Sequence, residues 1–236
     1  MPLSDESACE RSFGNGLMKF EAVIFDLDGT LLDSLEDIAS AANSVLSDLG
    51  KSTYPILDYR ELVGDGLAML FQRALPECES DLVLRASCMN RFEEAYSTCW
   101  NNRSKPYNGI DDLLKKLEEN SISLSVLSNK SDAFTNRCMK HFFGKVQFKH
   151  ILGQTDRFPR KPDPSSAKWL ASQLAVDIDR IAYVGDTNTD MKTALGSGLY
   201  AIGVTWGFRT ERELRAAGAM QICDDVGQLA DVLLGS

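Results

Sequence analysis

The sequence predicts an α/β fold, in which a doubly wound, Rossmann-like parallel sheet carries an inserted helical domain. Three observations predict it. Short apolar runs that fit buried strands alternate with helical patterns after about residue 105. A long block with helical spacing alone separates the first of these strands from the second. Polar and charged residues follow the strands at the edge where a parallel sheet gathers its ligands.

A short apolar run at residues 21–25 predicts the first buried strand. Helical spacing follows at residues 34–49, 58–75 and 80–100, with breaks at 54–55 and 63–66 and no strand-like run between. Beyond the proline–glycine segment at 105–109, both kinds of element are expected: helices at residues 110–119, 132–142, 164–173 and 189–195, and strands at residues 123–127, 147–151, 180–184 and 200–204.

Because strands and helices alternate in this part of the chain, the sheet is expected to be parallel with helices on both faces. The helical block before it is too long for an ordinary crossover connection. We therefore predict a helical cap, residues 33–105, inserted into a core made of residues 18–32 and 106–236. Residues 1–17 lack the apolar centre of a signal peptide and are predicted to be a flexible leader, with Met18 as an alternative start.

The composition is that of an ordinary globular protein. Of 236 residues, 44% are hydrophobic and 25% are charged, which disfavours a disordered or fibrous chain. Acidic residues exceed basic ones by 34 to 25, giving a net charge of −9, so nucleic acid and membrane surfaces are disfavoured as partners. The six cysteines form no C-x-x-C pair, there are two histidines, and no apolar stretch approaches a membrane span. A cytoplasmic protein with reduced thiols is expected.

The first predicted strand leads directly into D-L-D-G-T at residues 26–30. Side chains two residues apart on an extended backbone lie on one face, so Asp26 and Asp28 are expected to point into one space at the sheet edge. Gly29 permits the sharp turn that follows. Such a pair taken alone is more often a turn or a helix cap, and its significance comes from the other strand ends.

Three further segments are expected at the same edge. Ser128 and Asn129 follow the second strand, and Lys161 lies between two prolines in a later loop. Asp186 and Asp190 follow the fourth strand. Like charges about 4 Å apart repel by about 4 kcal/mol at an effective dielectric constant of about 20, so four converging carboxylates need a cation. Oxygen ligands without histidine or thiolate favour Mg²⁺, which pairs with phosphate, and a phosphorylated substrate is expected.

These segments resemble the four motifs of the haloacid dehalogenase superfamily of phosphatases, in the same order. The motifs are D-L-D-G-T, L-S-N, the lysine of R-K-P-D-P, and G-D-T-N-T-D. The resemblance covers nearly the whole chain from Lys19, and the helical insert lies where the family places its four-helix cap. It implies a Mg²⁺-dependent phosphatase that forms a phosphoaspartate.

The resemblance also implies roles for individual residues. Asp26 would be the nucleophile, and Asp28 would protonate the leaving alcohol and then activate water. Thr30 would help to position Asp28. Ser128 would hydrogen-bond the phosphoryl group, and Lys161 would screen charge between the nucleophile and the phosphate.

The implied Mg²⁺ ligands are Asp26, Asp186 and the carbonyl of Asp28, with Asp190 supporting them. Gly29 and Asn129 would contribute amides at the substrate. Phosphoglycolate phosphatase-like members carry a similar V-G-x-G stretch in the cap, preceded by an arginine. By that resemblance the candidates for substrate contacts in the cap are Arg60, Gly64 and Gly66.

A phosphoglycolate phosphatase-like hydrolase acting on 2-phosphoglycolate is therefore expected, as a monomer or homodimer whose partner is a small phosphorylated metabolite. A phosphosugar mutase of the β-phosphoglucomutase type, a pyrophosphatase or a nucleotidase shares the motifs and stays open. A dehalogenase is disfavoured, because a halide leaving group does not need the acid Asp28. A receiver-like signalling domain would have no use for the insert. An inactive binding protein would leave four carboxylates clustered without purpose.

Overall fold

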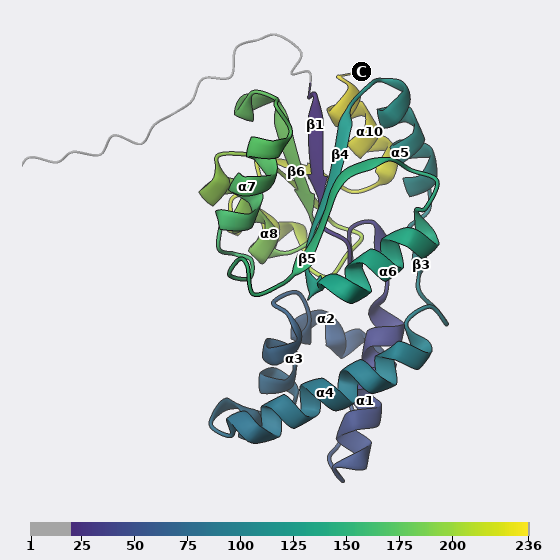
Figure 1. Cartoon of the computed structure of the whole chain (residues 1–236), viewed down its shortest axis with the longest axis vertical. Coiled ribbons are helices and arrows are strands. Elements are labelled where there is room, and N and C mark those ends of the chain that lie inside the picture. The colour runs from purple at the N-terminus through teal and green to yellow at the C-terminus, as the bar shows by residue number, and fades with distance from the viewer. Residues whose placement is uncertain (1–19, 236) are drawn as a thin grey trace, which may run out of the picture.

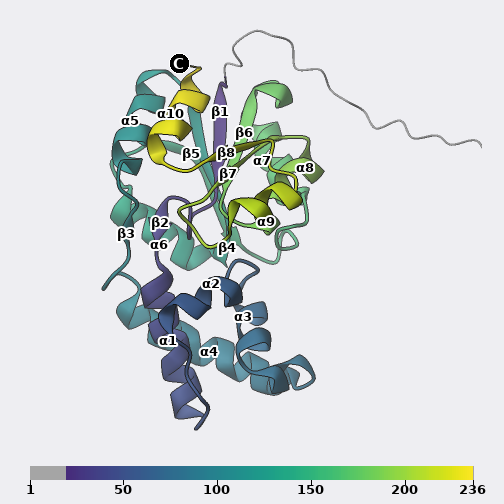
Figure 2. The ribbon, with the colours of Figure 1, turned by 180° about the vertical axis from the view of Figure 1, so that it is seen from behind.

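The computed structural model describes residues 20–235, so the predicted leader and Met18 lie outside the described residues. Its main sheet has six parallel strands in the order β5-β4-β1-β6-β7-β8 (Figures 1 and 2). The strands are β1 (Ala22–Phe25), β4 (Ser123–Ser131), β5 (Phe148–Gln154), β6 (Ile181–Gly185), β7 (Tyr200–Val204) and β8 (Gln221–Cys223). The central strand β1 is fully buried, because it is short, apolar and paired on both sides.

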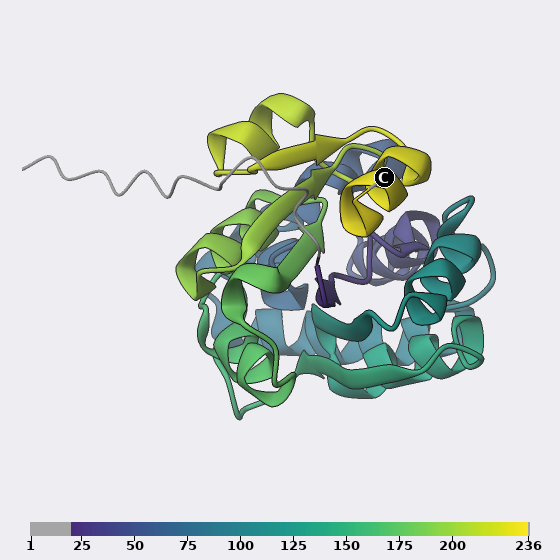
Figure 3. The same cartoon turned by 90° about the horizontal axis from the view of Figure 1, so that it is seen from above.

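Helices cover both faces of the sheet (Figure 3). One face packs against α5 (Ile110–Glu119), α6 (Asp132–Phe142) and α10 (Val226–Leu234), and the other against α7 (Ser165–Gln173), α8 (Asn188–Ser197) and α9 (Glu211–Ala216). Alternate side chains of β1 divide between the faces: Val23 and Phe25 belong to the first cluster, whereas Ala22 and Ile24 belong to the second. The predicted doubly wound α/β fold is thus confirmed.

A second group of helices lies beyond the carboxyl ends of the strands (Figure 1). It comprises α1 (Leu35–Asp48), α2 (Tyr59–Leu62), α3 (Leu67–Ala74) and α4 (Leu82–Cys99), with 3-10 turns at Ile56–Asp58 and Pro76–Glu79. We call α1 to α4 the helical layer. Two connections join it to the sheet, and they pair antiparallel as β2 (Leu32–Asp33) and β3 (Lys105–Pro106). Within residues 20–235, no helix combines the length and hydropathy needed to cross a bilayer.

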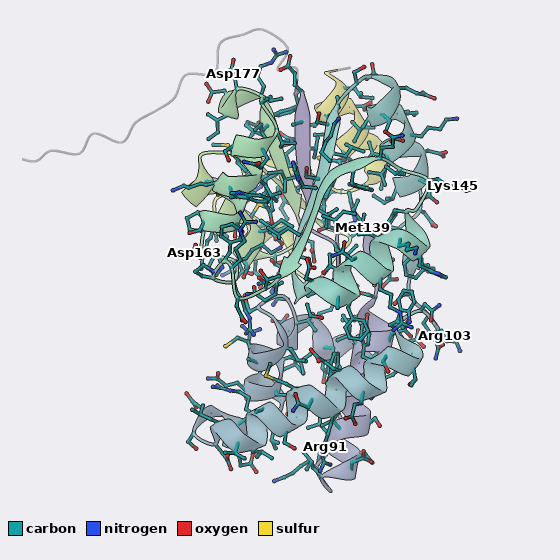
Figure 4. The ribbon with its side chains drawn as sticks, viewed as in Figure 1. Arg91, Arg103, Met139, Lys145, Asp163 and Asp177 are labelled. Atoms are coloured by element: carbon teal, nitrogen blue, oxygen red, sulfur yellow. The ribbon has the colours of Figure 1, made fainter. Side chains whose placement is uncertain are left out.

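Tight hydrogen bonding at the start of α1 fixes the two connections. The carboxylate of Asp37 is 2% exposed and accepts hydrogen bonds from the backbone of Arg103 and from the backbone and hydroxyl of Ser104, at 2.7–3.0 Å. The outgoing and returning segments are therefore held together just outside the sheet. Figure 4 shows side chains of the sheet edge and of the helical layer filling the space between them, with Asp163 marking the loop after β5.

Candidate active site

The register of the sheet brings three strand ends to one edge. Phe25 pairs with Val126 on one side and Val184 on the other, so Asp26 begins the loop at the same level as the neighbouring motifs. Strand β4 continues to Ser131, beyond the predicted end at residue 127, with an irregular register after Leu127. The serine and asparagine of the second motif therefore lie inside a strand, where the irregularity brings them to the pocket.

A cluster of three buried carboxylates lies at this edge. Asp26, Asp186 and Asp190 each offer an oxygen within 4.8 Å of the others, and they are 7%, 0% and 0% exposed. Burial and the charge of Asp190 raise the pKa of Asp26 to about 7, and the pKa of Asp186 is raised well above its usual value by burial and both neighbours. A hard divalent cation fits this oxygen-only donor set and offsets the repulsion, so the residues fit Mg²⁺.

Lys161 supplies the positive charge within the cluster. Its Nζ lies 2.9 Å from Asp26 Oδ1 and 2.7 Å from Asp190 Oδ1, and it donates to the carbonyl of Leu127 at 3.0 Å. Burial lowers the pKa of Lys161, but the two carboxylates outweigh burial and raise it well above the ordinary value. Asn129 holds the lysine backbone by accepting from its N–H at 2.9 Å and donating to its carbonyl at 3.1 Å.

The carboxylate of Asp28 lies apart from that cluster. Lys130 Nζ lies 3.0 and 3.1 Å from its two oxygens, and Ser34 Oγ donates to Oδ1 at 2.5 Å. Lys130 also donates to the hydroxyl of Tyr96 on α4 at 2.9 Å. Asp28 is thus held by groups from the sheet edge and from the helical layer. Both Asp26 and Asp28 line the pocket, as their spacing predicted.

Thr30 differs from its expected role. Its hydroxyl donates to Asp186 Oδ1 at 2.9 Å, whereas Ser34 and Lys130 hold Asp28. The reason is the tight turn after β1, in which the N–H groups of residues 30–32 all point to the carbonyl of Leu27 and turn Thr30 back toward β6.

Two glycines allow the close packing around Asp186. A Cβ at Gly29, which has φ +86°, would lie 2.2 Å from Asp186 Oδ2, and a Cβ at Gly207 would lie 2.3 Å from the same oxygen. The next residue, Phe208, donates its N–H to Asp186 Oδ2 at 2.8 Å. Gly29 therefore serves the packing of a carboxylate as well as the turn predicted from its sequence.

A pocket between the sheet edge and the helical layer contains most of the predicted residues. Asp26, Asp28, Ser128, Asn129, Gly64 and Gly66 line it. Its remaining wall is largely apolar and comes from α1, α3, α4 and α6, through Ile38, Leu67, Leu70, Met89, Phe92, Tyr96 and Phe134. This arrangement suits a small molecule with a polar reacting end.

Arg60 is not among the residues that line this pocket, and its expected contact with substrate stays a prediction. The buried Tyr59 fixes the orientation of the short helix α2, and the Arg60 side chain is exposed. The Arg60 carbonyl instead accepts a hydrogen bond from Arg209, which also donates to the carbonyl of Val63 at 2.9 Å. Buried Arg209 thereby anchors the loop that brings Gly64 into the pocket.

Sequence reasoning missed three contributors: Lys130, Arg160 and Phe208. Lys130 directly follows the second motif and Arg160 directly precedes the lysine of the third, so adjacency to a motif was the available signal. Phe208 acts through its backbone N–H, which no residue type reveals. Only the folded chain shows that these groups reach the site.

The edge of this α/β sheet thus carries two pocket carboxylates, a buried lysine and a cluster of three buried carboxylates, a set of groups that is typical of hydrolases. The family model described as haloacid dehalogenase-like hydrolase matches residues 23–204. The chain belongs to this family, and the resemblance of its four motifs is confirmed.

Similar proteins cover nearly the whole chain. It is 30% identical over 225 residues to the phosphoglycolate phosphatase of Psychrobacter arcticus, covering 92% of this chain and 97% of that protein. It is 30% identical to the phosphoglycolate phosphatase of Vibrio cholerae over 93% of this chain and all of that one. A crystal structure of a predicted phosphoglycolate phosphatase from Haemophilus somnus superimposes with a TM-score of 0.82 at 26% identity, covering 93% and 98% of the two chains.

Proposed function

We propose that the protein is a Mg²⁺-dependent phosphomonoester hydrolase that forms a phosphoaspartate and acts on 2-phosphoglycolate. The observation that carries this proposal is that two carboxylates of one pocket have different surroundings. Asp26 lies against Lys161 and the acidic cluster, whereas Asp28 lies apart, against Lys130 and Ser34. One carboxylate is thereby placed to attack phosphorus and the other to move a proton.

The first step joins Asp26 to phosphorus. The hydrogen bonds of Asp26 among the described residues, from Leu27 N–H at 2.7 Å and Lys161 at 2.9 Å, end on Oδ1, which leaves Oδ2 to attack. As the Oδ2–phosphorus bond forms, the bond from phosphorus to the ester oxygen breaks. Protonated Asp28 gives its proton to that oxygen, and the alcohol leaves.

The second step restores the enzyme. Asp28, now a carboxylate, takes a proton from a water molecule whose oxygen attacks the phosphorus of phosphoaspartate. The bond between phosphorus and Asp26 breaks, and inorganic phosphate leaves. Ser128 and Asn129, which line the pocket beside Asp26, bind the phosphoryl oxygens in both steps.

Asp26, Asp186 and the carbonyl of Asp28 would hold the Mg²⁺ ion, and Asp190 would support them. When bound, the ion supplies positive charge that offsets the charge of the phosphoryl group and of the carboxylates. Thr30 and Phe208 orient Asp186 for this purpose, and Thr187 orients Asp190 through its N–H at 3.1 Å and its hydroxyl at 2.6 Å.

The helical layer would act as the cap of this hydrolase. Its loop of residues 63–66 and its apolar wall enclose the pocket, which favours small substrates and limits access of bulk water during turnover. The similarity to two phosphoglycolate phosphatases over almost their whole length supports 2-phosphoglycolate as the substrate.

The test is phosphate release from a panel of small phosphoesters with Mg²⁺, together with the variant Asp26→Asn. We expect 2-phosphoglycolate to rank first and the variant to lose turnover, because an amide oxygen cannot serve as the nucleophile. The variant should unfold at the same temperature as the wild type or higher, since it removes one buried charge. Wild-type turnover by Asp26→Asn would exclude the phosphoaspartate, and an isomerised sugar phosphate as product would indicate a mutase.

A further inference from the structure

Two cationic side chains, Lys130 and Arg160, line the pocket. They differ in their partners. Lys130 is 8% exposed in its side chain and pairs with Asp28. The guanidinium of Arg160 forms no ion pair or hydrogen bond with any residue of the described range 20–235. Glu93 also lines the pocket, but it is exposed and forms no ion pair with Arg160 in the described part of the chain. Arg160 is therefore a pocket cation with its donors available.

The stem of Arg160 packs against the helical layer. A Cβ at Gly66 would lie 3.3 Å from Arg160 Cδ and 3.5 Å from both Nε and Nη1. Gly66, with φ +85°, thus leaves room for the guanidinium where the loop after β5 meets the helical layer. Arg160 is partly buried, so water competes less for its N–H donors than at an open surface, and an anion bound there gains more free energy.

Consecutive residues of one loop contact the two ends of the site. Lys161 reaches the acidic cluster with its Nζ 2.9 Å from Asp26, whereas Arg160 lies against Gly66. A substrate whose phosphorus lies at Asp26 would therefore extend toward Arg160. Most of the pocket wall is apolar, and an anionic group buried against it is costly unless a cation pairs with it.

We propose that Arg160 is a specificity-determining residue that binds the carboxylate of the substrate, so that the site selects small phosphomonoesters carrying a second anionic group. The planar guanidinium offers two parallel N–H donors to a carboxylate. This inference rests on the proposed phosphatase function and adds the group that distinguishes the substrate from other small phosphoesters.

The experiment compares 2-phosphoglycolate with 2-hydroxyethyl phosphate, which has the same chain length and an alcohol in place of the carboxylate. Wild-type enzyme should prefer 2-phosphoglycolate. Arg160→Gln should lower kcat/KM for 2-phosphoglycolate by about 10- to 100-fold, mainly through KM, because a charged hydrogen bond is lost. It should leave 2-hydroxyethyl phosphate within about threefold. Arg160→Lys, which keeps the charge without the planar pair of donors, should fall between, and it serves if Arg160→Gln does not fold.

Arg157→Gln is the matched control in the same loop. Arg157 is exposed, and its guanidinium carbon lies 4.3 Å from the ring centre of Trp169 rather than in the pocket. This variant should keep the wild-type ratio of the two substrates. An equal loss on both substrates in Arg160→Gln, or an unchanged ratio, would overturn the role of Arg160. A wild-type enzyme that releases phosphate from neither compound would instead refute the proposed phosphatase function.

Discussion

Lys130 joins the expected acid–base residue to the helical layer. Its Nζ contacts both oxygens of Asp28 at 3.0 and 3.1 Å and the hydroxyl of Tyr96 at 2.9 Å, and it lies 4.6 Å from the centre of the Tyr96 ring. The position of the Asp28 carboxylate therefore depends on the packing of α4 against the sheet edge. Lys130, which lies outside the four motifs, makes this connection.

Replacing Lys130 by methionine should lower kcat by about 100-fold, because general acid–base catalysis contributes about 10²- to 10⁴-fold and depends on the position of the carboxylate. KM should change much less, because Lys130 is occupied by Asp28. The measurement is steady-state phosphate release over a range of pH. Lys145→Met, at an exposed lysine far from the pocket (Figure 4), is the control and should behave as wild type. A wild-type kcat and pH profile for Lys130→Met would contradict the positioning role.

The raised pKa of Asp26 gives a second prediction. Folding raises this pKa from 3.8 to about 7, so the folded state binds the proton more tightly than the unfolded state. Without metal, the contribution of Asp26 to stability is present at low pH and is lost as pH rises from about 4 through about 7. Added Mg²⁺ should therefore raise Tm more near pH 8 than near pH 5.

Thermal unfolding at several pH values, with chelator or with millimolar Mg²⁺, measures this effect. Asp26→Asn is the control, and its metal-free Tm should depend less on pH because the titrating group is gone. A gain in Tm from Mg²⁺ that is no larger near pH 8 than near pH 5 would contradict the prediction.

At the residue scale, the sequence predicted the groups whose placement follows from a strand end. Asp26, Asp28, Asp186, Asp190 and Lys161 all reach the site, because parallel strands bring their carboxyl ends to one edge. The contact of Thr30 with Asp186, the exposure of Arg60 and the availability of Arg160 depend on turns and on helix packing between distant segments. Local pattern carries no information on such contacts.

The turn after β1 is the element whose backbone most directly shapes the metal site. Gly29 has φ +86°, and its missing side chain lets Asp186 approach. Gly29→Ala should displace Asp186 and lower Mg²⁺-dependent turnover by at least about 10-fold, since a single unfavourable contact of about 1.4 kcal/mol already gives that factor.

Gly50→Ala is the matched control, because Gly50 also has a positive φ, +68°, but has nothing within 4 Å of a Cβ. Both variants pay for a strained backbone, about 1 kcal/mol, and should lose Tm. Only Gly29→Ala should require more Mg²⁺ for half-maximal activity. Equal Mg²⁺ requirements in the two variants would show that Asp186 tolerates the added methyl group.

Among the elements, the agreement with prediction varies. The helices α5 and α6 and the strand β7 begin and end at the predicted residues. Four short elements do not show a hydrophobic period and were missed: the two-residue strands β2 and β3, the three-residue strand β8 and the six-residue helix α9. The helix α10 was missed as well. The division of the chain at residues 33 and 105 stays a prediction, and the pairing of β2 with β3 lies at those positions.

Across the whole molecule, the helical layer meets the sheet at a second place, opposite its connections. Arg209 donates to the carbonyls of Arg60 and Val63, and Asn129 donates to the carbonyl of Gly64 at 3.2 Å. Asp65 accepts a hydrogen bond from Thr189 on α8. Burial acts to raise the pKa of Asp65, but the hydrogen bonds from Thr189 and Arg73 and the charge of Arg73 outweigh burial and lower this pKa. The loop of residues 63–66 is thereby fixed to the core.

Arg209→Met should loosen this contact, because the carbonyls of Arg60 and Val63 lose a charged donor, and hydrogen bonds to charged groups contribute about 1.5–3 kcal/mol. The amides of residues 60–66 should exchange with deuterium about 10- to 100-fold faster, while those of β1 stay protected. Hydrogen exchange with mass spectrometry measures both. Arg212→Met, at an exposed position on α9, is the control and should exchange as wild type. Unchanged exchange at residues 60–66 in Arg209→Met would contradict the anchoring role.

The pairing of β2 with β3 also sets the geometry of any motion of the helical layer. Both chain crossings lie side by side at Asp33 and Lys105, so the chain joins the layer to the core at one place rather than at two separated places. We expect a helical layer attached at one place to move mainly by rotation about that place. The hydrogen bonds from Arg209 lie away from these crossings, so we expect them to oppose such a rotation. The distance between two labels, one on α3 and one on α8, would measure this rotation.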